Sequence, residues 1–538
     1  MPRGICRGFF REMRSRSWLW VGGFLVALLA GYWFARSAVP EKEAGRVAKV
    51  AESYKAPHET PDPEPWFKRG EREVVFKTDS EAQEAGALVG QRGLIFKDRA
   101  SLEAFLKKAG NKVIIMGRLE ALNILRVGFL NYQDLADLLD GSEQLAMIFP
   151  ANVPENEYVA AQPGAVAMGS SLLGWLGITG DNSSWGTGVT IAVLDTGVSS
   201  HSAFGGKVSA LGAAGDVNGH GTAVASMILG NTDQLPGVAP GSSILSIQIA
   251  DAAGYSDSFK IAEGILSAID AGVDIINISM GSSGDSAVLR AAIQKAIDAG
   301  VMIIAPTGNS GLNQVFYPAA NKGVIAVGAV DRNGAVMAFS NYGEAVAVAA
   351  PGYGLNSAWV DNGAVSVSGT SFSSPIIAGL IAATMTESGG TLTANQAWQV
   401  VLNNLNEAGA PGVDESVGGG LPDMSRVLAA RTKGIFDAAV ASQWVSSDKG
   451  NTQLQVTVQN RGTETLVNTG LQVTSPAGTS YFNSTTLNPG AIQTFTVPLS
   501  NTGESMRFES TVSISNGQTD TKPANNRRVE TYTTTPAR

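Results

Sequence analysis

Apolar and polar positions follow different periods in different parts of this 538-residue chain, and the changes of period divide it into regions. Within residues 165–431, short runs rich in Val and Ile are apolar at nearly every position, as in VTIAVLD, SILSIQIA, DIINISM, VMIIAP and GVIAVGAV. Runs between them, such as FKIAEGILSAIDAG, have helical spacing and end in Gly. Strands without a polar face belong in a parallel sheet that is covered on both sides. We therefore predict a doubly wound α/β domain, with its site at the carboxyl ends of the strands.

Residues 88–155 have a different order of elements. Strand-like apolar runs occupy 93–96, 113–116, 124–130 and 145–149. The segments SLEAFLKKAG and NYQDLADLLDG have apolar residues at the i, i+3, i+4 spacing of amphipathic helices. The order β-α-β-β-α-β predicts a ferredoxin-like α+β domain.

Residues 432–538 show the period of two that is typical of half-buried strands. The runs TQLQVTVQN, LQVTSP, IQTFTVPL and FESTVSIS alternate apolar and polar residues, and turn sequences such as NRG and NPG separate them. This pattern predicts a β-sandwich in which Ile, Val, Leu and Phe line one face of each strand.

The N-terminal region combines a basic tail, an apolar run and a spacer. Residues 1–17 hold five arginines and one glutamate, and residues 18–35 are uncharged. These 18 residues, at about 1.5 Å each in a helix, just span a hydrocarbon core of roughly 30 Å. Trp and Tyr at both ends are typical of membrane interfaces. We predict a single-pass signal anchor with the catalytic part outside the cytoplasm; residues 36–87, rich in Pro, would be a spacer.

A cleaved signal peptide is the alternative for this N-terminal region. Ala35, Arg36 and Ser37 form a small-x-small pattern that a signal peptidase accepts. The protein would then be secreted, and both interpretations export everything that follows.

The charge of the chain excludes one class of partner. Residues 159–431 contain 19 acidic and 8 basic side chains, a net charge of −11, within a chain whose net charge is −9. Nucleic-acid binding needs a basic surface, so no nucleic-acid partner is expected.

Three short motifs carry the parts of a nucleophilic site. They are VLDTGV with Asp195, NGHGTAVAS with His220 and SGTSFSSP with Ser371. Histidine can take the proton of a serine hydroxyl, and a carboxylate fixes the imidazole tautomer and stabilises the imidazolium. A fourth motif, IIAPTGNSG, offers Asn309, whose amide can donate to an oxyanion. Asp216 competes with Asp195 for the histidine, but its loop setting predicts a solvated side chain.

These motifs and their order (Asp, His, Ser) resemble the subtilisin-like serine proteases, over roughly residues 185–430. The resemblance implies an endopeptidase in which Ser371 is the nucleophile, His220 the base and Asp195 its orienting carboxylate, with Asn309 at the oxyanion. It also implies that Ser279, Met280 and Gly281 form an edge strand that pairs with substrate, and that Gly308 belongs to the substrate site.

The resemblance extends to the flanking regions. Residues 88–155 are similar to the family's inhibitory propeptide, which implies a zymogen that cleaves itself within 151–170, with the propeptide as its own inhibitor. A small accessory α+β domain is the alternative, and the position directly before the protease-like segment favours the propeptide. Residues 432–538 are similar to the immunoglobulin-like modules of exported enzymes. No cofactor is required for the chemistry. The family often binds structural calcium, but no Asp-x-Asp-type loop assigns metal ligands here.

Some positions depart from the family pattern while every reacting group is kept. Ala223 follows Gly-Thr where the family often has His, and Phe372 and Ile376 replace common Met and His. Pro306 and Thr307 replace alanines on a wall of the site for the substrate side chain. These positions affect specificity rather than the reaction itself.

Two alternatives come from other classes of protein. A catalytically idle subtilisin-like scaffold for protein binding would lack one of the four reacting groups, and all four are present. A serine esterase or lipase would show a Gly-x-Ser-x-Gly motif and the order Ser, Asp, His, which this chain lacks.

Overall fold

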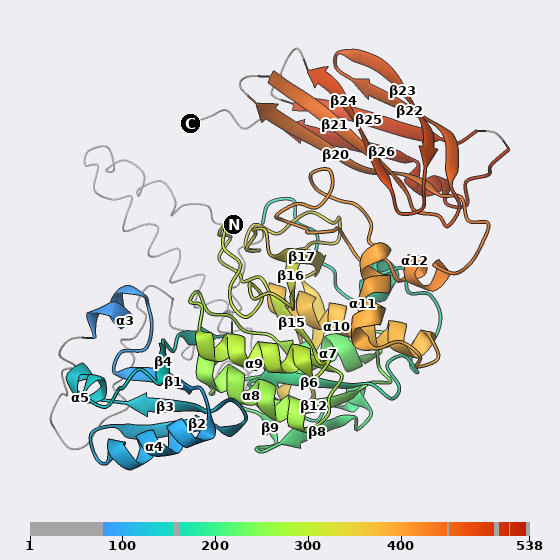
Figure 1. Cartoon of the computed structure of the whole chain (residues 1–538). Helices are drawn as coiled ribbons and strands as arrows, with labels where there is room; N and C mark the ends of the chain where they lie inside the picture. Colours follow the sequence, from blue (N-terminus) through green and yellow to red (C-terminus); the bar gives the residue numbers. More distant parts are fainter. Residues whose placement is uncertain (1–78, 154–161, 449–450, 500–504, 516, 534–538) are drawn as a thin grey trace, which may run out of the picture. The chain divides into compact units, whose positions relative to one another are not determined.

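The computed structural model describes residues 79–153, 162–448, 451–499, 505–515 and 517–533, which all belong to one compact unit (Figure 1). The predictions for the basic tail, the apolar run 18–35 and most of the spacer lie outside the described residues, as does part of the predicted cleavage region. Among the described residues, no helix is long and apolar enough to cross a membrane.

The central domain contains a parallel sheet of seven strands, as the apolar runs predicted. Its strand order is β17-β16-β15-β14-β6-β12-β8. The strands are β6 (Thr190–Asp195), β8 (Val208–Leu211), β12 (Ser243–Gln248), β14 (Ile275–Ile278), β15 (Met302–Pro306), β16 (Val324–Val330) and β17 (Val346–Pro351).

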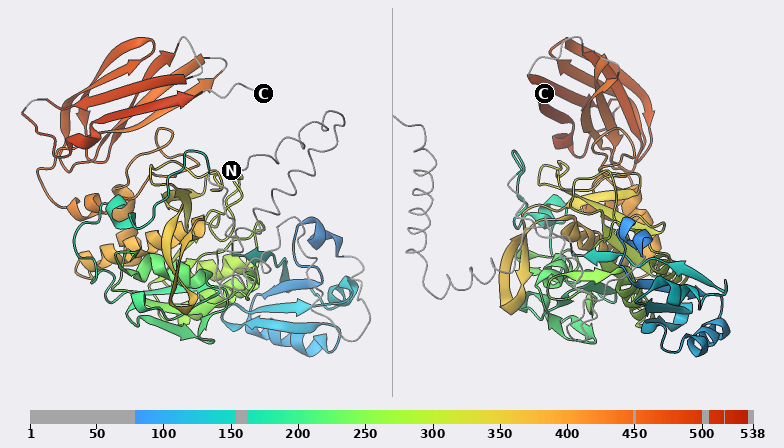
Figure 2. Two further views of the ribbon diagram at one scale, coloured as in Figure 1. Left: turned by 180° about the vertical axis from the view of Figure 1, so that it is seen from behind. Right: turned by 90° about the vertical axis from the view of Figure 1, so that its left-hand side faces the viewer.

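Helices cover both faces of this sheet, which explains why its strands have no polar face (Figures 1 and 2). On β6, Ile191 and Val193 point into one core, and Ala192 and Leu194 point into the other. The first core contains α7 (His220–Leu229) and α10 (Thr370–Glu387), and the second contains α8 (Ser258–Asp270) and α9 (Ala287–Asp298). This is the predicted doubly wound arrangement.

Smaller elements connect and border the sheet. The helices are α6 (Leu172–Trp175), α11 (Ala394–Asn403) and α12 (Met424–Ala429); the strands are β7 (Gly197–Val198), β9 (Gly215–Asp216), β10 (Asn231–Thr232), β11 (Leu235–Pro236), β13 (Tyr255–Asp257), β18 (Leu355–Trp359) and β19 (Gly363–Val367).

The N-terminal described domain has the predicted β-α-β-β-α-β order. Its antiparallel sheet has the strand order β2-β3-β1-β4. Its elements are β1 (Gln91–Phe96), α4 (Arg99–Ala109), β2 (Ile114–Leu119), β3 (Ile124–Gly128), α5 (Tyr132–Ala136) and β4 (Glu143–Ala146). Both helices pack on one face, over a core that includes Leu94, Phe105 and Leu135.

This domain begins earlier than the sequence predicted, so the spacer does not extend to residue 87. A short helix, α3 (Ser80–Glu84), buries Ala82 completely. The buried carboxylate of Asp79 pairs with Arg92 and accepts a hydrogen bond from the Gly90 N–H. The polar composition of this stretch led to its prediction as spacer. The contacts that order it depend on Arg92 of β1 and on Gly90 in the preceding turn, which the local composition does not indicate.

The second face of the N-terminal sheet packs against α8 and α9. A Cβ added to Gly93 would stand 2.6 Å from Val288 of α9, and one added to Gly117 would stand 2.7 Å from Phe259 of α8. Arg126 also forms an ion pair of 2.8 Å with Asp257, the N-cap of α8, and both side chains are largely buried. The two domains therefore share a close-packed apolar contact and a shielded ion pair.

The C-terminal residues form two antiparallel sheets with a shared apolar core, as predicted. One sheet has the order β20-β21-β24 and the other β23-β22-β25-β26. The strands are β20 (Ala438–Asp448), β21 (Asn451–Asn460), β22 (Leu466–Ser475), β23 (Gly478–Leu487), β24 (Ile492–Leu499), β25 (Ser505–Ser513) and β26 (Arg527–Thr533).

Candidate active site

The carboxyl edge of the central sheet brings the predicted motifs together. Asp195 is the last residue of β6, Ser279 follows β14, and Asn309 lies shortly after β15. These three strands are neighbours and run parallel, so their ends meet at one edge. His220 is the first residue of α7, and Ser371 is the second residue of α10.

Asp195 and His220 are in direct contact. His220 Nδ1 lies 2.8 Å and 3.0 Å from the two carboxylate oxygens of Asp195, and both residues are buried. The Thr196 N–H donates a further hydrogen bond of 2.7 Å to the same carboxylate. A buried carboxylate needs such partners. With a carboxylate at Nδ1, the neutral imidazole has its proton on Nδ1 and its lone pair on Nε2.

Small residues allow α7 to begin this close to the strand end. A Cβ at Gly221 would stand 1.9 Å from the Gly197 carbonyl oxygen and 3.1 Å from the Asp195 Cβ. Any side chain there would push the helix away from β6 and lengthen the bond between His220 and Asp195.

Asp216 has a role that the sequence analysis did not predict. Its carboxylate is not solvated but accepts five hydrogen bonds, including those from the backbone N–H of Gly219 and of Thr222 in the first turn of α7. The competing carboxylate therefore holds the N-terminus of the helix that carries His220, while Asp195 contacts the imidazole.

Ser371 lies at the N-terminus of α10, and the helix also contains Pro375 beyond its first turn. Because α10 starts at Thr370, Pro375 is its sixth residue rather than part of its first turn. Proline has no N–H, so the carbonyl of Ser371, four residues earlier, has no helical donor. The Ser279 hydroxyl donates to this carbonyl at 3.0 Å, and Asn277 Nδ2 donates to Ser279 at 2.7 Å.

The helices that carry Ser371 and His220 pack together, but the two side chains are not hydrogen-bonded to each other. The Ser371 Oγ lies 3.4 Å from the Ser279 carbonyl oxygen, and His220 Nε2 is buried without a hydrogen-bond partner among the described residues. The ring of Phe372, the residue after Ser371, lies 5.2 Å from the imidazole, centroid to centroid. Nucleophile–base hydrogen bonds are commonly loose before substrate binds.

Asn309 is oriented by a residue that the sequence analysis did not single out. Thr370 donates to Asn309 Oδ1 from its backbone N–H at 2.9 Å and from its hydroxyl at 2.7 Å. With its oxygen held in this way, the side-chain amide presents Nδ2 as the end that can donate. The Gly-Thr before the serine is the signal that could have indicated this contact.

The predicted substrate-edge residues can offer their backbone N–H and C=O groups to a substrate, but not the side chains of Ser279 and Met280. Ser279 and Met280 are fully buried, and the Met280 side chain belongs to the apolar core beneath the edge. Gly281 exchanges two hydrogen bonds of 3.1 Å with Asn152, in an antiparallel bridge. Asn152 belongs to β5 (Pro150–Asn152), which pairs on its other side with β13. An extended segment is thus already held at this edge.

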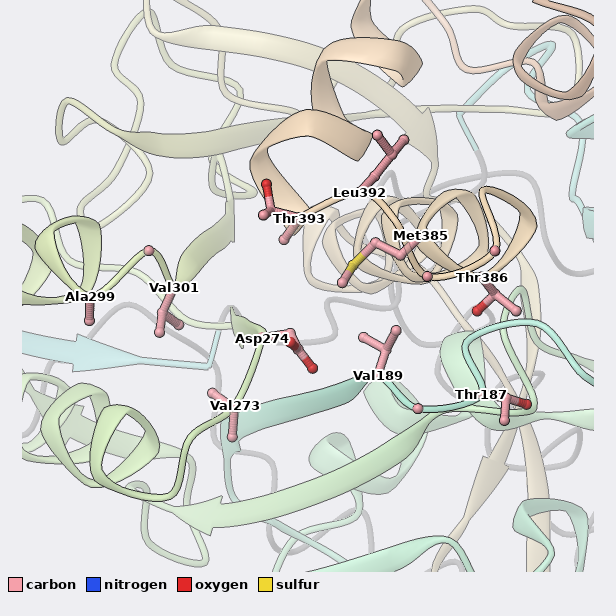
Figure 3. A pocket seen from close by; sticks show the side chains of 15 residues that line it. Thr187, Val189, Val273, Asp274, Ala299, Val301, Met385, Thr386, Leu392 and Thr393 are labelled. Atoms are coloured by element: carbon pink, nitrogen blue, oxygen red, sulfur yellow. The ribbon is translucent and has the colours of Figure 1, made fainter. Parts of the chain in front are cut away.

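A cavity of about 670 Å³ lies at the opposite, amino-terminal edge of the sheet (Figure 3). It is lined by the turns before β6, β14 and β15 and by the end of α10. Among the described residues that line it, Asp274 is the titratable one, and its carboxylate accepts a hydrogen bond from the Thr190 N–H. None of the predicted site residues lines this cavity.

The described part of the chain contains no group of three or more His, Cys, Asp or Glu side chains that could hold a metal ion. A structural calcium ion therefore stays a prediction without assigned ligands.

Comparison with known proteins finds similar sequences in the subtilases. The model of the Subtilase family, Peptidase_S8, matches residues 186–420. The chain is 38% identical to the thermostable alkaline protease of Halalkalibacterium halodurans, over 42% of this chain and 64% of that protein. It is 36% identical to subtilisin Savinase of Lederbergia lenta, over 37% of this chain and 76% of that protein.

The chain spans 64% and 54% of the first two curated relatives that it matches, the second being alkaline elastase YaB of a Bacillus species. Among solved structures, the prenylagaramide maturation protease PagA is 29% identical, with a TM-score of 0.42 over 46% of this chain and 93% of that chain.

Replacing Ser279 by Ala should destabilise the start of α10, because the buried Ser371 carbonyl would lose its donor at 3.0 Å and keep the Ser374 hydroxyl at 3.5 Å, while Asn277 Nδ2 would lose its acceptor. Leaving such a group unpaired costs about 1–3 kcal/mol of the free energy of unfolding. The measurement is urea denaturation in a Ser371→Ala background, which prevents self-digestion. Ser283→Ala, at an exposed serine nearby, should change the free energy by less than about 0.5 kcal/mol. Equal stabilities of the Ser279→Ala and Ser283→Ala proteins would show that the hydroxyl does not support the helix.

Proposed function

Because the chain belongs to the subtilase family, we propose that it is an exported serine endopeptidase that hydrolyses peptide bonds through Ser371, His220 and Asp195. The observation that carries this proposal is the contact of 2.8 Å between His220 Nδ1 and the Asp195 carboxylate. Within the described part of the chain Nε2 of His220 has no hydrogen-bond partner, and its ring lies beside Phe372 at the start of α10.

In the proposed reaction, the Ser371 Oγ attacks the carbonyl carbon of the scissile peptide bond and its proton passes to His220 Nε2. Asp195 stabilises the resulting imidazolium. The negative charge on the former carbonyl oxygen is met by Asn309 Nδ2 and the Ser371 N–H, at the positive end of α10. His220 gives its proton to the leaving amine. Water, activated by the same histidine, then hydrolyses the acyl-enzyme and releases Ser371.

We propose that the N-terminal described domain is an inhibitory propeptide. Three contacts support this role: its sheet packs on α8 and α9, Arg126 pairs with Asp257, and its last strand, β5, is bonded to Gly281 at the predicted substrate edge. A domain that holds its own tail at this edge would block substrates until the connection is cut within residues 151–170. The protein substrate and the propeptide would then compete for the same backbone groups.

This proposal predicts that residues 39–538 shorten themselves after synthesis. Intact-mass analysis of the wild type should give a new N-terminus within 151–170, while Ser371→Ala and His220→Ala should stay whole. His201→Ala is the matched control, because Nδ1 of this second buried histidine accepts from the Ala203 N–H and Nε2 contacts the Gly363 carbonyl, away from the triad. Processing of the Ser371→Ala protein at the same bond would refute self-cleavage by Ser371.

We further propose that residues 18–35 anchor the enzyme in a membrane, which would place the protease on the exported side. Support comes from the sequence: the uncharged run follows five arginines and is flanked by aromatic residues. The Ser371→Ala full-length chain should stay in carbonate-washed membranes with its N-terminus intact, while the same chain without residues 1–38 should not. An N-terminus at Ala38, directly after the Ala35-Arg36-Ser37 pattern, would instead show that the segment is a cleaved signal peptide.

A further inference from the structure

The ring of Phe316 lies between two glycines of the predicted substrate site. A Cβ at Gly281 would stand 3.1 Å from the Phe316 Cβ and 3.3 Å from its Cδ2, and a Cβ at Gly308 would stand 2.9 Å from the same Cδ2. All three distances are shorter than the roughly 3.5–4.0 Å of an ordinary carbon–carbon contact, so a side chain at either glycine would collide with the ring. The phenyl group therefore occupies the space in which side chains at positions 281 and 308 would otherwise lie.

The backbone of Phe316 is fixed to both neighbouring segments. Its N–H donates to the Thr307 carbonyl at 3.0 Å, next to Gly308. The following residue, Tyr317, exchanges two hydrogen bonds of 2.8 Å with Ser282, next to Gly281. Phe316 is partly exposed. Hydrogen bonds on both sides of Phe316 therefore fix the position of its backbone and hence the place of its ring at this surface.

The position of this ring matters for the residue on the acyl side of the scissile bond, called P1. In an antiparallel ladder with the register of Asn152 and Gly281, the peptide residue two positions further along faces Ser279. The Ser279 carbonyl lies 3.4 Å from the Ser371 Oγ. A substrate residue that faces Ser279 would have its carbonyl carbon next to the Ser371 Oγ. If Asn309 binds the oxygen of that carbonyl, the same substrate residue lies beside Gly308. A side chain at that position would then meet Phe316.

We propose that Phe316 restricts P1 to small side chains (Gly, Ala and Ser), so that the enzyme cleaves after small residues and rejects large apolar ones. This inference rests on the proposed endopeptidase function and names a specificity-determining residue for it. Neighbouring Pro306 and Thr307 are part of the same surface: Phe316 is bonded to the Thr307 carbonyl, and β15 ends at Pro306.

The test compares peptide p-nitroanilides that differ only at P1, with Ala, Leu or Phe, on the processed enzyme made from residues 39–538. Excess or missing methylenes in such a site change kcat/KM by about 10–200-fold. We expect the wild type to prefer Ala over Phe by at least about tenfold, and Phe316→Gly to raise kcat/KM for the Phe substrate by about 10–100-fold. The Ala substrate should change by less than about threefold.

The ratio of two kcat/KM values does not depend on the amount of folded enzyme, so partial unfolding does not obscure the result. Phe316→Leu, a milder change, should move the ratio in the same direction. Leu312→Ala, at an exposed position of the same connection, should leave the ratio unchanged. If the wild type cleaves after Phe as well as after Ala, or if both Phe316 variants keep the wild-type ratio, the inference is wrong while the protease function stands. If no peptide or protein substrate is cleaved at all, the proposed function itself fails.

Discussion

The contact between Asp195 and His220 is the interaction on which the candidate site depends. A carboxylate that is fully buried at the end of a strand is unfavourable unless it is paired and hydrogen-bonded. The imidazole supplies one partner and the Thr196 N–H another. The contact in turn requires α7 to start directly against β6, which Gly221 allows and the capping of the helix by Asp216 stabilises. Loosening any of these elements would separate the base from its carboxylate.

A second constraint fixes the serine relative to this pair. Ser371 stands at the first turn of a helix that is buried along most of its length, so its position is set by core packing as well as by local bonds. Because Pro375 has no N–H, the Ser371 carbonyl lacks its helical hydrogen bond. The hydroxyl of Ser279, which directly follows β14, donates a hydrogen bond to that carbonyl instead. The start of α10 is therefore tied to the strand end that we expect to bind substrate. Asn309 is tied to the same helix through Thr370. The proposed nucleophile, the proposed oxyanion donor and the predicted substrate edge are therefore linked by hydrogen bonds to the start of one helix.

The sequence predicted the elements better than the contacts between them. Periodicity was sufficient for the seven-stranded sheet, for the β-α-β-β-α-β domain and for the C-terminal strands, because each depends on local patterns of burial. The motifs around Asp195, His220, Ser371 and Asn309 predicted which strand ends and helix starts would meet. Asp216 was misjudged because its five donors come from residues that only the folded turn brings around it.

Ser279 and Phe316 show the same limit. Nothing local in the sequence indicates that the Ser279 hydroxyl donates a hydrogen bond to the carbonyl of Ser371, 92 residues away. Phe316 lies in a connection without helical or strand period, and its importance depends on two glycines that follow two separate strands, β14 and β15. The folded start of the N-terminal domain at Asp79 was missed for a similar reason, since its partner Arg92 lies in the next strand. The periodicity of apolar and polar residues does not reveal which tertiary contacts a single side chain makes.

The most direct test of the account is covalent labelling of the processed enzyme with phenylmethanesulfonyl fluoride, followed by peptide mapping. Attack by an activated Oγ on sulfur expels fluoride and leaves a sulfonyl group on that oxygen. The account predicts a single adduct on Ser371, formed together with complete loss of peptide hydrolysis. An adduct on another serine such as Ser373 or Ser374, or full hydrolysis by a protein labelled at Ser371, would contradict it.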